Sequence, residues 1–103
     1  MFVKLSRSTK ADKKMTAIFY DNDRKKVKTI HFGQKNAGDF IIYSRTKGKK
    51  FAMERKRLYL QRHKKEVGGM MTASTLSKMI LWNKPTLEAS YQAYKKRYNL
   101  TKY

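Results

Sequence analysis

The sequence has no cysteine, a single proline and seven acidic residues among 103. Without cysteine it has no disulfides, no thiolate metal ligands and no thiol nucleophile. Its cysteine usage therefore does not distinguish an oxidising from a reducing compartment. No apolar run approaches the ~18 residues of a membrane span. The first ten residues, MFVKLSRSTK, lack the uncharged segment of a signal peptide. We therefore expect neither a membrane span nor a signal peptide.

Residues suited to catalysis are also scarce. His31 and His63 are the only candidate bases near neutral pH. The loop 33–38, GQKNAG, has glycines at both ends, but no Gly-Lys-Ser/Thr follows it, so it is not a phosphate-binding Walker loop. We expect a protein that is not an enzyme and has no small-molecule substrate or cofactor.

Two short patterns resemble parts of metal sites. Residues 21–23 read Asp-Asn-Asp but lack the glycine and the distal glutamate of a calcium loop, so a hairpin turn is the better interpretation. His63 and Glu66 are three apart, which is half of a metal site without a matching second half. We expect no bound metal.

The dominant feature is positive charge. Lysine and arginine number 26 against seven acids, which gives a formal net charge of +19. The mean hydropathy of −0.83 is typical of a disordered chain, but aromatic residues make up 13%, which favours a fold. A monomer gains nothing from self-repelling charge, so we expect a polyanionic partner. The basic runs predict phosphate contacts by Arg24, Lys25, Lys26, Lys28, Arg45, Lys47, Lys49, Lys50, Arg55, Lys56, Arg57, Arg62, Lys64, Lys65, Lys95, Lys96 and Arg97.

The pattern predicts one α+β domain over residues 1–103. Its β-rich part covers about 1–48, with strands at 2–7, 15–20 and 27–32 and a turn at 21–24 that makes the last two a hairpin. The run 40–43 fits a third strand or a loop anchor. The expected architecture is a small antiparallel sheet packed by two or three helices from the part 49–103.

Helix signals begin near residue 49. The composition of 49–66 favours a helix that ends at the glycine pair 68–69, with Val67 on the same side as Ala52 and Tyr59. Thr72 or Ser74 can cap a second helix, which Pro85 closes. Thr86 can cap a third.

An aromatic stripe follows on the third helix. Leu87, Tyr91, Tyr94 and Tyr98 recur at helical spacing, and Trp82 lies just before them. These rings could stack on bases or anchor a protein contact, but the spacing favours the core. The tail 98–103 is a candidate contact for a neighbouring protein.

Part of the sequence resembles a known family. The strings RLYLQRHKKE at 57–66, TASTLSK at 72–78 and LWNKPTL at 81–87, with Phe-Gly at 32–33 and Gly-Asp-Phe at 38–40, are similar to small basic proteins of large nucleocytoplasmic DNA viruses, the giant viruses. The similarity covers about 30–98. The family has no assigned activity, so the resemblance implies a context, the virion or the host cytoplasm or nucleus during assembly, and no catalytic residue. Where other members have a tryptophan, this chain has Val67 followed by two glycines.

Two functions fit these observations. The first is a non-enzymatic virion protein that binds nucleic acid, DNA rather than RNA, through phosphate contacts without sequence readout. The second is a minor capsid or cement protein whose charge matches acidic surfaces of neighbouring capsid proteins. A DNA binder leaves the particle with the genome, whereas a cement protein stays with the emptied shell.

Overall fold

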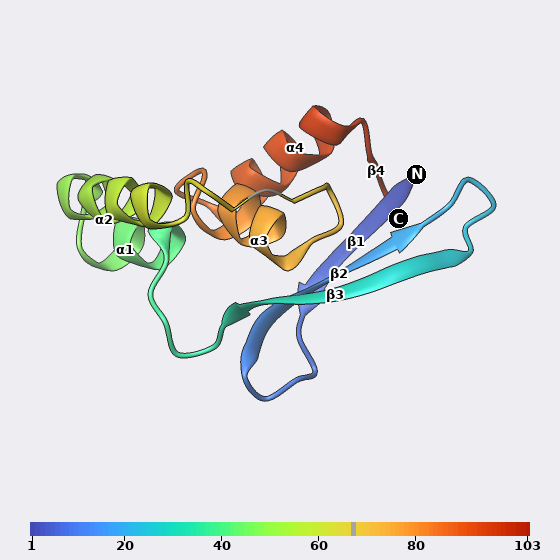
Figure 1. Ribbon diagram of the computed structural model, residues 1–103, viewed down its shortest axis with the longest axis horizontal. Coiled ribbons are helices and arrows are strands. Elements are labelled where there is room, and N and C mark those ends of the chain that lie inside the picture. The colour runs from blue at the N-terminus through green and yellow to red at the C-terminus, as the bar shows by residue number, and fades with distance from the viewer. Residues whose placement is uncertain (67) are drawn as a thin grey trace.

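A computed structural model describes residues 1–66 and 68–103 (Figure 1). The chain begins with the strands β1 (Phe2–Arg7), β2 (Lys13–Tyr20) and β3 (Lys26–Gln34), and it ends with the short strand β4 (Thr101–Lys102). The sheet has the order β3-β2-β1-β4. The α+β prediction is confirmed. The sheet is mixed rather than purely antiparallel, because β4 runs parallel to β1.

Alternation places one set of apolar side chains of the strands on the face that packs into the core. Val3, Ala17 and Phe19 are buried, as is Phe32 of the third strand, and Val3 pairs directly with Phe19. At the predicted turn, an Asp21 carboxylate oxygen accepts backbone hydrogen bonds from residues 23 and 25, each of 2.9 Å. Hydrogen bonds of an aspartate to its own following backbone favour such turns, so the predicted hairpin is confirmed.

The run after the 33–39 loop is a helix, not a strand or a loop anchor. The helix α1 (Phe40–Thr46) begins after Asp39, whose side chain accepts a hydrogen bond of 2.9 Å from the backbone N–H of Ile42. An aspartate at this position satisfies one of the free N–H groups of the first turn. The apolar run therefore starts a helix, with Phe40 as its buried residue.

The helix α2 (Lys49–Arg62) forms as predicted but ends earlier than residue 66. Its buried residues are Ala52 and Tyr59, so nothing beyond Tyr59 fixes a further turn against the core. His63 leaves the helical conformation, and its N–H donates to the carbonyl of Tyr59. The prediction for the helix side of Val67 falls outside the residues that the structure describes.

Two threonines begin the later helices. Thr72, rather than Ser74, caps α3 (Ala73–Leu76), which continues directly into the π-helical segment η1 (Ser77–Leu81). Thr86 caps α4 (Leu87–Tyr98), as the sequence predicts, and Asn99 ends it in the left-handed conformation at φ 54°. A left-handed residue just after the last turn is a common helix stop.

The aromatic stripe belongs to the core. Tyr91 and Tyr94 of α4 are buried, and their hydroxyl groups donate to the carbonyls of Val3 and Met70 at 3.0 and 2.6 Å. The core interpretation is confirmed for these residues and for Trp82, which is 8% exposed. It is wrong for Leu87, which is 39% exposed at the first position of α4.

The C-terminal tail completes the sheet of its own chain. The N–H groups of Thr101 and Tyr103 donate to the carbonyls of Met1 and Val3, and the Tyr103 ring stacks on Tyr20 at 3.7 Å. One side of β4 is bonded to β1 and the other lies at the edge of the sheet, so the expected contact of this tail with a neighbouring protein stays a prediction.

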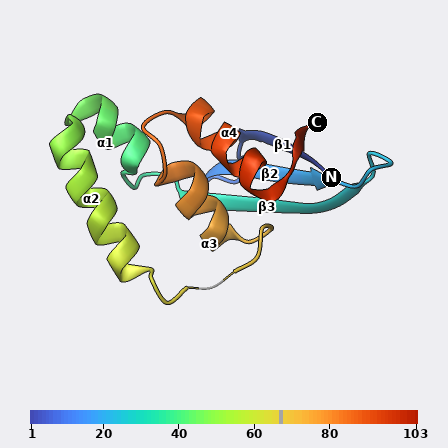
Figure 2. The same cartoon turned by 90° about the horizontal axis from the view of Figure 1, so that it is seen from above.

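The helices α1 and α2 project past one end of the sheet, while the β2–β3 turn lies at the opposite end (Figures 1 and 2). The molecule is accordingly elongated, with extents of 44 × 29 × 25 Å. A buried ion pair links β2 to the start of α1, because the Lys14 ammonium lies 2.6 Å from the Asp39 carboxylate. No helix among the described residues is long and apolar enough to cross a membrane.

Candidate nucleic-acid interface

Most of the basic residues predicted to contact phosphate are exposed to solvent. Fourteen of the seventeen are exposed, and three, Arg55, Lys56 and Lys95, are partly buried. A long basic side chain can bury its stem and keep its charged end in water, so partial burial alone does not remove a phosphate contact. The contacts of the charged ends therefore decide which of them can reach an anion.

The fold divides these residues between the two ends of the molecule. We call the residues of α1, α2 and the turns beside them the helical basic region; its members are Arg45, Lys47, Lys49, Lys50, Arg55, Lys56, Arg57, Arg62, Lys64 and Lys65. We call the β2–β3 turn region the hairpin basic region; its members are Arg24, Lys25, Lys26 and Lys28. The last three, Lys95, Lys96 and Arg97, lie in the final turns of α4, next to β4. The predicted residues thus form separate patches, not one surface.

Acidic side chains neutralise few of these charges. Among the described residues, two ion pairs involve lysine or arginine, Lys14–Asp39 and Arg57–Glu54. Asp21 is engaged by the backbone of its own turn. The positive charge of both basic regions therefore remains largely uncompensated within the chain.

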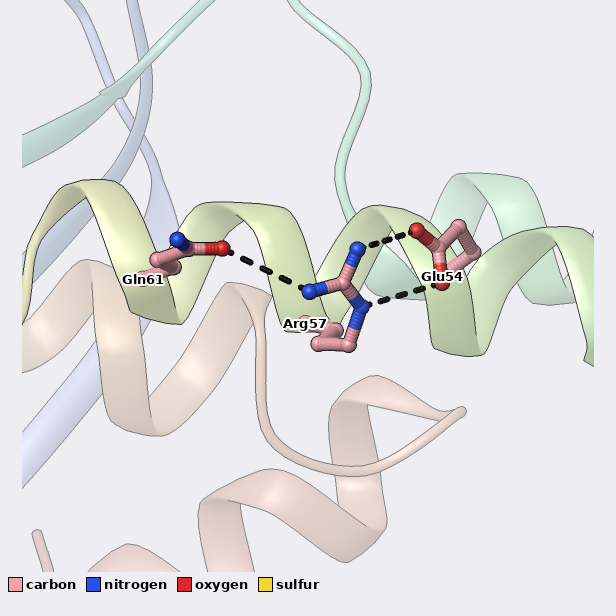
Figure 3. Close-up of polar contacts among 3 residues, drawn as sticks. All are labelled: Glu54, Arg57 and Gln61. Carbon is pink, nitrogen blue, oxygen red and sulfur yellow. Dashed lines mark hydrogen bonds and ion pairs between the residues drawn. The ribbon is translucent and has the colours of Figure 1, made fainter.

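Arg57 is the clearest exception (Figure 3). Its guanidinium donates to both carboxylate oxygens of Glu54, at 2.6 and 3.1 Å, and to the Gln61 side chain at 3.4 Å. This hydrogen bonding lowers the pKa of Glu54, which therefore stays charged at neutral pH. A phosphate at Arg57 must compete with this carboxylate.

Arg55 and Lys56, which precede Arg57 in α2, differ in role. The Lys56 ammonium donates to the carbonyl of Asn83 at 2.7 Å and lies 4.9 Å from the centre of the Phe40 ring. Burial, followed by repulsion from Lys84, lowers the pKa of Lys56. It therefore connects α2 to the segment before α4. Arg55 instead lies with its guanidinium 5.8 Å from the centre of the Tyr43 ring, which leaves its hydrogen-bond donors available.

A row of rings lies beside these cations. From one end to the other it runs Phe51, Tyr43, Trp82, Tyr59 and His63, with successive centres 5.3, 6.2, 4.4 and 4.2 Å apart. The row combines side chains of α1, α2 and the residue after η1. The sequence reasoning missed it, because these residues come from separate segments and share no single periodic pattern. Interleaved cations and flat rings are characteristic of single-strand binding surfaces.

The middle of the row borders a groove of about 320 Å³. Arg55 and Arg62 of α2 line it together with His63, the residue after α2, and the end of β3 and the loop that follows it contribute further lining. Cations and aromatic rings of the helical basic region therefore meet at a concave surface in this groove.

The two histidines make local contacts. The Nδ1 atom of His31 lies 2.7 Å from the Ser8 hydroxyl and 2.9 Å from the Thr16 hydroxyl, and Nδ1 of His63 lies 2.8 Å from the Glu66 carboxylate. Over residues 1–66 and 68–103 no three histidine, aspartate or glutamate side chains gather as a metal site would require.

Comparison with family models, curated proteins and solved structures found no match to this chain. The functional assignment therefore depends on its own surface chemistry.

Proposed function

We propose that this protein is a non-enzymatic, strongly basic protein that binds nucleic acid through phosphate contacts without sequence specificity. The supporting observation is the exposed charge that its own acids leave uncompensated: 26 basic residues against seven acids, with two lysine or arginine ion pairs in the described part of the chain. Double-stranded DNA carries about one negative charge per 1.7 Å, and releasing its counterions drives association with such a surface.

The location of the basic residues favours contacts to the backbone over readout of bases. They lie at and beside the β2–β3 turn and along α1 and α2, and lysine, a flexible point charge, is common in both regions. Phosphate contacts position a protein, whereas base contacts specify a sequence. Random and defined duplexes should consequently bind within a few-fold of each other.

Two variants of equal charge loss test the proposal. One carries Gln in place of Arg45, Lys47, Lys49 and Lys50, and the other carries Gln in place of Arg24, Lys25, Lys26 and Lys28. All eight residues are exposed, so folding should be retained, and circular dichroism checks this. Duplex affinity, measured by fluorescence anisotropy, should fall for at least one variant. Four lost contacts would make the salt slope shallower by up to about 3.5. Unchanged affinity in both variants would contradict the proposal.

A second function has an observation of its own. Met53 and Leu60 are 47% and 36% exposed and, being two turns apart, lie on one side of α2. Exposed apolar side chains beside cations suit a protein contact, as a minor capsid or cement protein would make. The virion location stays a prediction from the sequence resemblance. Fractionation of purified particles separates the functions, because a cement protein would remain with the emptied shell.

A further inference from the structure

The groove beside α2 is built where the backbone comes unusually close to side chains. Gly33 has φ +79°, and a Cβ there would lie 2.7 Å from a methyl group of Leu81. A Cβ at Gly38 would collide with the phenol of Tyr43. The two glycines therefore let the end of β3 and the loop after it come close to Leu81 and Tyr43, and both segments contribute to the lining of the groove.

The lining carries net positive charge. Arg55 and Arg62 are seven residues apart, so they lie on the same side of α2, about 10 Å apart along its axis. The acid in the lining, Asp39, is paired with Lys14, and that pair is neutral. The two arginines therefore leave the groove with a net charge of +2 when His63 is neutral.

Aromatic side chains contribute to the lining of the groove. Trp82 and Tyr59 are stacked almost parallel, at 5° and 4.4 Å, and the Tyr43 and His63 rings flank them. Tyr59 and Trp82 are 9% and 8% exposed, so a planar group in the groove would meet the rims of these two rings and the partly exposed Tyr43 and His63. Arginine beside aromatic rings is a recurring combination in sites for single-stranded nucleic acid, where the cation meets phosphate and the ring meets the base.

We propose that this groove binds one unpaired nucleotide of a nucleic acid, with its phosphate at Arg55 and Arg62 and its base against the aromatic side chains. The inference depends on the proposed function. It assigns to the groove the subsite at which the protein would distinguish single-stranded from double-stranded nucleic acid. The groove volume of about 320 Å³ lies at the lower end of ligand sites. That space admits a single nucleotide but not a base-paired stack.

Trp82 makes the groove directly observable, because it is the only tryptophan of the chain and belongs to the lining. In a fluorescence titration of the wild-type protein, adenosine 5′-monophosphate should quench Trp82 saturably. Its affinity should exceed that of inorganic phosphate or adenosine by about tenfold or more. A single-stranded 12-mer should quench in the same way, and a blunt duplex of the same sequence should bind without comparable quenching.

Substitutions assign the signal to the groove. Arg55→Gln and Arg62→Gln should each weaken binding of the monophosphate by about tenfold. The control Lys10→Gln, at an exposed lysine outside both the lining and the basic regions, should leave that binding unchanged. Circular dichroism confirms the fold of each variant. A readout that needs no variant is the single indole N–H resonance of Trp82, which should shift with the monophosphate in wild-type protein.

Each other outcome has a defined meaning. If inorganic phosphate binds as tightly as the nucleotide, the groove takes an adventitious anion only, and the inference is wrong. If DNA binds while Trp82 responds to none of the probes, the inference fails and the proposed function stands. If neither single strands nor duplexes bind, both the proposed function and this inference are wrong.

Discussion

Replacing Trp82 by Ala should remove most of the stability of this protein. Trp82 is 8% exposed and stacks on Tyr59 at 4.4 Å, and the centre of the tilted Tyr43 ring lies 6.2 Å from that of Trp82. Truncating a buried tryptophan costs about 3–5 kcal/mol, and a lost aromatic pair accounts for about 0.5–1.5 kcal/mol of such changes. A domain has about 5–15 kcal/mol in total, so we expect a loss near 4 kcal/mol.

Urea unfolding followed by far-ultraviolet circular dichroism measures this loss, because the substitution itself removes the tryptophan signal. With an m-value of about 1–2 kcal/mol per molar urea, the midpoint should fall by about 2–4 M. Leu60→Ala, on the exposed side of α2, is the control and should cost less than about 0.5 kcal/mol. A Trp82→Ala midpoint within about 0.3 M of wild type would refute the reasoning and favour Trp82 as an interface anchor.

Substitutions at three further positions test other contacts. Asp39→Ala removes both the α1 cap and the ion-pair partner of Lys14, so it should lower the free energy of unfolding in urea by about 3 kcal/mol or more. Asp39→Asn retains the cap acceptor and should lower it less. Equal losses for the two variants would contradict this account of the ion pair. Burial, followed by the electrostatic effect of the neighbouring Tyr98, raises the pKa of Tyr94. Because the folded state therefore disfavours the phenolate form of Tyr94, the stability of the protein should fall as the pH rises above about 10. Tyr94→Phe should weaken that fall, at a cost of about 1 kcal/mol at pH 8 for the lost hydrogen bond, and an unaltered pH profile would show that Tyr94 is not its source. Glu54→Gln frees Arg57 and should tighten DNA binding with a slightly steeper salt slope, so weaker binding would count against a phosphate role for Arg57.

Elements with a periodic or capping signal could be predicted from the sequence. The strand pair joined at Asp21 and the helices begun by Thr72 and Thr86 follow from alternation, turn chemistry and capping. The same capping logic applies to Asp39, but the apolar run behind it is short and rich in isoleucine, which favours strand by composition. The cap and the contact with Lys14 decide in favour of helix, and that ion pair joins positions 25 apart in sequence.

The candidate site could be predicted only as a property of the composition. The basic residues are visible in the sequence as runs, and residues 55–57 are predicted to contact phosphate as one run. The fold gives the three members of this run different partners. Lys56 bonds to the Asn83 carbonyl, Arg57 to Glu54, and only Arg55 faces the groove. Which side of a helix is covered depends on the elements packed against it, and no local pattern contains that information.

The dependence of duplex binding on salt tests the central claim most directly. If phosphate contacts drive association, the logarithm of the affinity should fall linearly with the logarithm of the salt concentration, and about 5–8 contacts give a slope near −5 to −7. Fluorescence anisotropy with a labelled random-sequence duplex at several sodium chloride concentrations provides the measurement. A slope in that range supports the proposed function, whereas a slope shallower than about −2 would contradict it.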